Sequence, residues 1–176
     1  MDALADVYQL RDLTGMPWAN ETAAAQSLAS ASGMVRAYCE WPIAPTYTET
    51  VTLDSDGGQI LHLPCLHVTA VTAVTVLGVT LATSDYRWSR AGMLFRAVGW
   101  PDGLATVEVT FTGGYDASPA EVVAVVCSLA GRGAAPAGVA SMTVGPETVT
   151  YARSRDGVGL ATSEQAVLDR YRIGQA

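Results

Sequence analysis

The chain has 176 residues, 17 of them acidic and 10 basic, and its formal net charge is −7. This length fits one domain with at most a small appendage. Every basic residue is an arginine and lysine is absent, so the sequence argues against an extensive basic surface of the kind that grips nucleic-acid phosphates without regard to sequence.

The N-terminal part of the sequence predicts two helices. Asp2 can cap a first helix over residues 2–13, and Gly15 follows its end. Asn20 can cap a second helix over residues 20–39. Apolar residues recur in this second segment at steps of three and four, namely Ala24, Leu28, Ala31, Val35 and Tyr38.

The segment 47–112 is rich in threonine and valine and predicts an antiparallel β region. We expect three hairpins and one further strand in it, namely 47–53 with 59–63, 74–77 with 79–81, 85–88 with 93–96, and 105–112. Residues 68–76 form a triplet repeat of the type Val-Thr-Ala. A period of three fits neither a helix nor a regular pleated strand, and only its last part is assigned to a hairpin.

The sequence Ser118-Pro119-Ala120-Glu121 predicts a third helix, over residues 119–129. It combines an N-cap serine, a proline at the first helical position and a glutamate two residues later. The glycine-rich segment 131–138 then predicts a hinge. The chain is thus expected to divide into a body, residues 1–136, and a tail, residues 137–176.

The tail is expected to hold an extended segment, 141–151, and a short helix. The sequence Thr162-Ser163-Glu164-Gln165 predicts a capping box for this helix, which should end near Arg172. The resulting fold class is α+β, with a small helical bundle, an inserted antiparallel β-hairpin region and an extended C-terminal tail.

No pattern in the sequence predicts catalysis, a cofactor or a metal. His62, Cys65 and His67 lack a fourth ligand at zinc-site spacing, so they are interpreted as ordinary strand-end residues. A G-x-S-x-G nucleophile motif is missing, and a Walker A motif would need a lysine. The chain is therefore expected not to be an enzyme.

Tyrosine and arginine gather in the tail, and these residue types often anchor protein interfaces. The candidate interface residues are Tyr151, Arg153, Arg155, Arg170, Tyr171 and Arg172. The tail is too short for a core of its own. We expect it to fold against the same chain, a neighbouring copy or a partner.

Several short segments, taken in order, are similar to a known family. They are Asp12-Leu13-Thr14-Gly15, Val35-Arg36-Ala37-Tyr38-Cys39, Gly78, Asp85-Tyr86, Val109-Thr110-Phe111-Thr112-Gly113-Gly114-Tyr115, Ser118-Pro119, and Leu168-Asp169-Arg170-Tyr171-Arg172. Together they resemble the head-to-tail adaptor (connector) proteins of tailed bacteriophages. The resemblance spans most of the chain, and its motifs are packing and turn signals.

This resemblance implies a structural protein of the virion neck, made in the cytoplasm of the bacterial host. Such adaptors assemble as a ring, typically a dodecamer, on the portal protein. They extend the DNA channel and dock a stopper or tail-completion protein. The resemblance implies that DNA passes through the ring without specific binding, and no membrane is involved. The net charge of −7 adds the expectation of an acidic channel.

A second interpretation belongs to a different class. The β region 47–112 could be a small module that binds a ligand or carbohydrate, with the helices as its support and no role in a virion. Binding to a portal ring supports the first interpretation, whereas a stable monomer that binds a small ligand supports the second.

Overall fold

The computed structural model describes residues 2–15, 20–134, 141–144, 147–150 and 159–174. Its contacts define two compact units. The helical unit comprises residues 1–35 and 119–170, and the β unit comprises residues 36–118 and 171–176. Helices and antiparallel sheets are both present, so the predicted α+β class is confirmed. No helix in the described ranges is long and apolar enough to span a bilayer.

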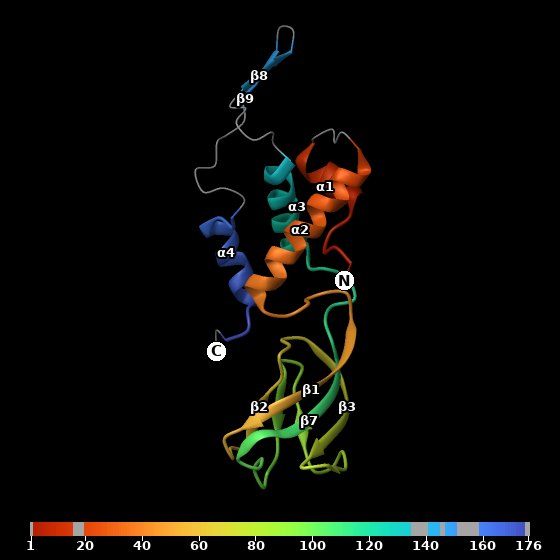
Figure 1. Ribbon diagram of the computed structural model, residues 1–176, viewed down its shortest axis with the longest axis vertical. Helices are drawn as coiled ribbons and strands as arrows, with labels where there is room; N and C mark the ends of the chain where they lie inside the picture. Colours follow the sequence, from red (N-terminus) through yellow and green to blue (C-terminus); the bar gives the residue numbers. More distant parts are fainter. Residues whose placement is uncertain (1, 16–19, 135–140, 145–146, 151–158, 175–176) are drawn as a thin grey trace. The chain divides into compact units, whose positions relative to one another are not determined.

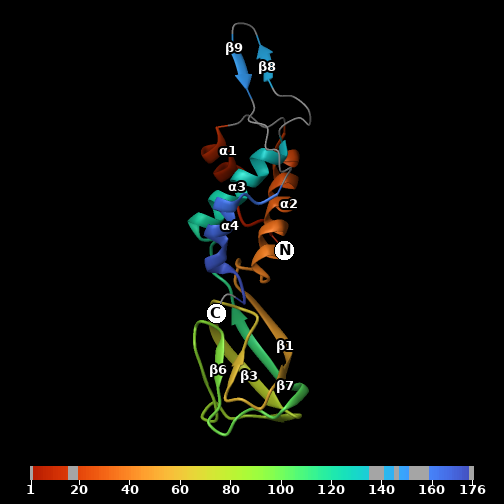
Figure 2. The same cartoon turned by 90° about the vertical axis from the view of Figure 1, so that its left-hand side faces the viewer.

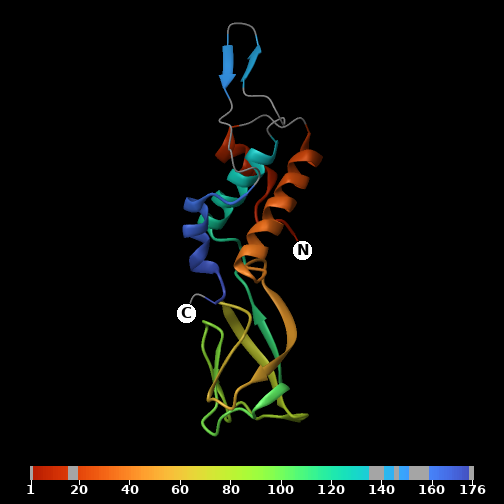
Figure 3. The same ribbon diagram turned by 60° about the vertical axis from the view of Figure 1, so that its left-hand side comes forward.

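Four α-helices build the helical unit (Figure 1). They are α1 (Val7–Thr14), the part of α2 (Glu21–Cys39) up to Val35, α3 (Ala120–Ala134) and α4 (Thr162–Leu168), which a 3-10 turn, η1 (Asp169–Tyr171), follows. Figure 3 shows α4 beside α3. Their facing sides bury small and medium apolar side chains, among them Leu10, Leu28, Val122, Val126, Leu129 and Leu168. Burial of these side chains is the main source of stability for a unit with few aromatic residues.

The first and third helices differ from the predicted bounds. Asp6, not Asp2, caps α1: its Oδ1 accepts a hydrogen bond from the Gln9 backbone N–H at 2.8 Å, and Gln9 Oε1 accepts one from the Asp6 N–H at 2.9 Å. The third helix continues through Ala134, so the start of the predicted hinge is helical. Gly131 is buried where α3 approaches Thr14 closely, and this tertiary packing outweighs the low helix propensity of glycine.

Two sheets build the β unit (Figure 2). The first has the strand order β1-β7-β3-β4, and the second has the order β2-β6-β5. Figure 2 labels β1, β7 and β3 of the first sheet and β6 of the second. The strands are β1 (Tyr47–Ser55), β2 (Ile60–His62), β3 (Val68–Val76), β4 (Val79–Thr80), β5 (Arg87–Trp88), β6 (Met93–Phe95) and β7 (Gly103–Gly113). The side chains of Val74, Val107, Val109, Phe111 and Leu94 are fully buried in its core.

Strand pairing confirms two of the three predicted hairpins and corrects the other. β3 pairs with β4, and β5 pairs with β6, as expected. β1 does not pair with β2, because β1 pairs with β7 and β2 with β6. The outward threonines of β1 explain this choice: Thr48 and Thr50 lie opposite Thr112 and Thr110 of β7, with hydroxyl oxygens 2.8 Å apart in both pairs.

The triplet repeat is a single strand, β3, with two irregularities in its pairing. Its register against β7 shifts between Val68 and Ala70 and again between Val71 and Ala73. Each shift places one extra residue in β3, as a β-bulge does. Val68, Val71 and Val74 therefore pair with Gly113, Phe111 and Val109, which alternate along β7. A period of three on one strand thus matches a period of two on its neighbour.

In the tail, the predicted extended segment forms two strands. Ser141–Val144 (β8) and Glu147–Thr150 (β9) pair as an antiparallel hairpin, with Met142 opposite Val149.

Candidate partner interface

The structure describes three of the six predicted interface residues. Arg170 is exposed and is the last residue of the helical unit, whereas Tyr171 and Arg172 are half-buried and belong to the β unit. Tyr151, Arg153 and Arg155 lie outside the described residues. The structure therefore locates the part of the predicted interface at residues 170–172.

Tyr171 joins a cluster of rings within the β unit. Its ring contacts Tyr115 edge-on, with centroids 6.3 Å apart. Tyr115 stacks on His67 at 4.2 Å and lies 6.2 Å from the ring of Trp41. The Trp41 indole N–H donates a hydrogen bond to the backbone oxygen of Tyr171, so the cluster holds the backbone of the C-terminal segment as well as its side chain.

Arg172 lies against the last turn of α2. Its guanidinium sits 5.2 Å from the ring centre of Tyr38, and its Nη2 is 3.5 Å from Glu40 Oε1. The next residue, Ile173, donates its N–H to the oxygen of Cys39 at 3.1 Å. The ion pair is partly exposed and contributes little to stability. The ring contact and the backbone hydrogen bond fix the position of the segment.

These contacts show that Tyr171 and Arg172 fold against their own chain. Sequence reasoning left three partners open for the tail, and the contacts of these two residues lie within the β unit. Sequence reasoning also missed His67 and Tyr115 as members of the cluster, because stacking between residues 48 positions apart in sequence leaves no local pattern. A role for the six residues in binding another protein stays a prediction.

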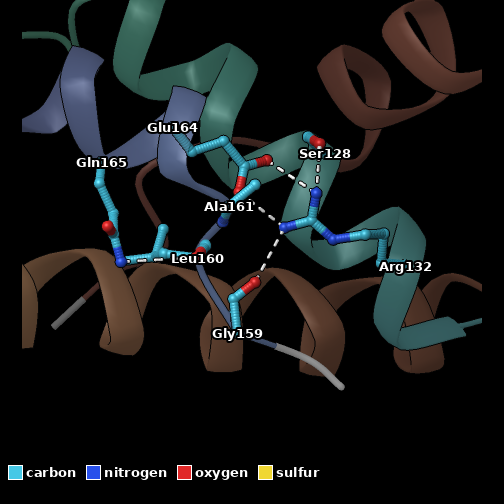
Figure 4. Close-up of polar contacts among 7 residues, drawn as sticks. All are labelled: Ser128, Arg132, Gly159, Leu160, Ala161, Glu164 and Gln165. Atoms are coloured by element: carbon cyan, nitrogen blue, oxygen red, sulfur yellow. Dashed lines mark hydrogen bonds and ion pairs between the residues drawn. The ribbon is translucent and has the colours of Figure 1, made fainter. Parts of the chain in front are cut away.

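A salt bridge attaches α4 to α3 in the helical unit (Figure 4). Two nitrogens of the Arg132 guanidinium donate to the two carboxylate oxygens of Glu164, at 2.9 and 2.7 Å. Arg132 also donates to the Gly159 oxygen at 3.2 Å and to Ser128 Oγ at 3.3 Å. A planar guanidinium facing a carboxylate in this two-bonded manner gives a directional contact.

Glu164 also completes the start of α4, in a way that corrects the predicted capping box. The N-cap is Ala161, not Thr162, and it has no side-chain oxygen to offer. Glu164 Oε2 accepts the Ala161 N–H at 2.9 Å, which is one half of the box. Burial opposes the negative charge of Glu164, but hydrogen bonds from Arg132, the Ala161 backbone and Ser128 outweigh it and lower its pKa. The hydrogen bond to Glu164 raises the pKa of Arg132.

The structure separates the histidines and the cysteine that the sequence brings close together. His67 is stacked on Tyr115, Cys65 is buried, and His62 is exposed on β2. Among the residues that the structure describes, no three His, Cys, Asp or Glu side chains gather closely enough to hold a metal ion. Burial raises the pKa of the Cys127 thiol to about 11, so this thiol stays protonated at neutral pH.

No protein-family model matches this sequence, and no curated protein matches it significantly. Three solved structures of gene transfer agent (GTA) particles do contain similar chains. In the neck of the empty particle, computed with C6 symmetry, the chain is 18% identical with a TM-score of 0.57. In the neck of the native particle, computed with C12 symmetry, it is 19% identical with a TM-score of 0.53. In the virion of the native particle these values are 18% and 0.54.

The chain has the fold of these neck proteins. The match covers 94% of this chain and 87–88% of each of the others, so it includes both the helical unit and the β unit. The resemblance to head-to-tail connectors that the sequence indicates is thereby confirmed at the level of the fold.

Proposed function

We propose that this protein is a structural component of a phage-like neck, a head-to-tail adaptor that forms a ring on the portal. The observation that carries the proposal is the likeness to neck chains over 94% of the sequence. The C6 and C12 symmetries with which those necks were computed support a ring of copies, and a dodecamer is the proposed number. This ring extends the DNA channel and docks a stopper or tail-completion protein.

The composition suits such a role. A conduit for DNA must let the duplex slide, and a chain with net charge −7 and no lysine offers few groups that hold phosphates. The function proposed is structural and not enzymatic. The protein is made in the host cytoplasm and resides in the virion neck.

The six candidate interface residues of the tail are proposed as the contact with the portal. Arg170 is the exposed member of the set within the described residues, so it is the best single probe. Charged groups at the edge of an interface mainly affect association rate and orientation. Tyr171 and Arg172 position the segment through their contacts with Trp41 and Tyr38.

Mixing the purified chain with the portal ring of the same phage tests this function. We expect the chain to co-sediment with the portal and electron microscopy to show an added ring. Arg170→Glu should weaken this association about tenfold, whereas Arg11→Glu, a reversal at an exposed position of α1, should leave it unchanged. A chain that stays monomeric and never joins a portal would contradict the adaptor role, and a glycan or ligand library would then test the binding-module interpretation.

A further inference from the structure

The small sheet β2-β6-β5 has an apolar outer face. Along β2 and β6 the residues alternate, with Leu61 and Leu94 buried and their neighbours exposed. Ile60 lies opposite Phe95 in the register, and the two side chains are 52% and 39% exposed; Met93, which lies opposite His62 two positions further along, is 40% exposed. Three large apolar side chains on one face of a three-stranded sheet form a patch that a partner can cover.

The β2 edge of this sheet borders an acidic hollow. The hollow has a volume of about 720 Å³ and is open to solvent. Ile60 and Leu104 supply apolar groups to its lining, and Leu104 is 83% exposed. Asp54, Asp56 and Asp102 supply its charge. This edge thus combines apolar surface with three carboxylates.

The opposite edge of the sheet, formed by β5, has the complementary character. Arg87 and Trp88 make up this strand, and both are exposed. Arg90 follows in the turn to β6 and is also exposed. Within the described part of the chain, the side chains of Arg87 and Arg90 have no carboxylate partner. This edge therefore combines an aromatic ring with two arginines available for ion pairing.

We propose that the two edges bind each other between copies, so that the β5 edge of one copy docks into the acidic hollow at the β2 edge of the next. Arg87 and Arg90 would face the carboxylates, and Trp88 would cover the apolar groups at Ile60 and Leu104. The proposal rests on the adaptor function, because it assigns the contact between neighbours in the ring. The occupant of the hollow is a second copy of this chain.

Charge and geometry both favour a second copy. The two surfaces lie on opposite edges of one sheet, and a contact between two different patches of the same chain propagates head to tail, which gives a ring when the rotation between neighbours closes. The hollow carries three acidic residues, and the edge proposed to fill it carries two arginines. β2 and β5 hold only three and two residues, so strand pairing between copies would be short and side chains must supply most of the contact.

Charge reversal at both edges tests the proposal. Asp102 is the best position in the hollow, because Asp54 accepts the Ala105 N–H and Asp56 accepts the Gly58 N–H in their own chain. Arg87→Glu and Asp102→Arg should each weaken ring formation about tenfold or more, because like charges then face each other. An equimolar mixture of the two variants should restore it, since every contact in an alternating ring is again between opposite charges.

Mass photometry and electron microscopy, with and without the portal, would read out the rings. Arg11→Glu and Asp12→Arg are matched controls, since both residues are exposed on α1. If wild type and all variants form rings equally well, the proposed contact is wrong and the adaptor function stands. If wild type forms no oligomer in solution and no ring on the portal, both proposals fail. A variant that binds the portal singly but forms no ring supports the contact.

Discussion

At the scale of single residues, Glu164 is the side chain on which the attachment of α4 most depends. It is 8% exposed, accepts two hydrogen bonds from Arg132 and accepts the N–H of Ala161, the N-cap residue of its own helix. Removing one member of a largely buried pair leaves the other charge without compensation. We expect Glu164→Gln to lower the free energy of unfolding of the helical unit by about 2 kcal/mol, measured by circular dichroism during urea unfolding.

The same pair makes the stability of the helical unit depend on pH. The pKa of Glu164 lies below its usual value in the folded chain, so its contribution is complete above the unfolded-state pKa of about 4.3 and is lost as the pH falls further. The stability difference between wild type and Glu164→Gln should therefore shrink from pH 7 to pH 3. Asp12→Asn, at an exposed carboxylate of α1, is the control. An equal difference at both pH values would contradict the ion pair.

Gly92, in the turn between β5 and β6, is a second residue with a defined requirement. Its φ is +80°, and a Cβ atom there would lie 2.1 Å from the carbonyl oxygen of Cys65. Gly92→Ala should destabilise the β unit by at least about 3 kcal/mol, since backbone strain and a direct clash combine. Gly78→Ala is the matched control, with φ +83° and no atom within 4 Å, and should cost about 1 kcal/mol. Similar losses in the two variants, followed by tryptophan fluorescence during urea unfolding, would refute the close contact.

At the scale of elements, short-range sequence patterns predicted the features that neighbouring residues determine. The helices, the two tight hairpins at Gly78 and Gly92 and the α+β class all depend on caps, turns and periodicity, which neighbouring residues determine. The pairing of β1 with β7 joins Tyr47 to Gly113, and a turn signal at residues 54–58 contains no information about that distant choice. The repeat in β3 became interpretable only with its partner, because its two bulges are defined by the register against β7.

The candidate interface shows the same division. Clustering of tyrosine and arginine in the tail drew attention to Tyr171 and Arg172, which contact residues of their own chain, while their role in binding a partner stays a prediction. Their contacts, Trp41, Tyr115 and Tyr38, lie 56 to 134 positions away along the sequence, so composition could not identify them. The edges β2 and β5 also escaped prediction, because their complementary charges become meaningful only when both strands lie in one sheet.

At the scale of the whole molecule, charge makes a prediction about DNA. Three of the outward residues of β1 are threonines, and the fourth is Asp54. Two of the threonines share hydrogen bonds with threonines of β7, and the residue opposite Thr52 is Glu108. With a net charge of −7 in every copy, the proposed ring would carry a large negative total charge, which opposes its association with duplex phosphates.

We therefore expect neither the free chain nor its ring to retain duplex DNA in a mobility-shift assay, even at low salt of about 50 mM, where electrostatic binding is strongest. The positive control is a triple variant, Thr48→Lys, Thr50→Lys and Thr52→Lys, which places three cations on one exposed face. It should bind DNA at low salt and release it as the salt rises. Wild-type binding with a steep salt dependence would mean that arginines dominate a local surface, and an acidic channel would then be the wrong description of the ring.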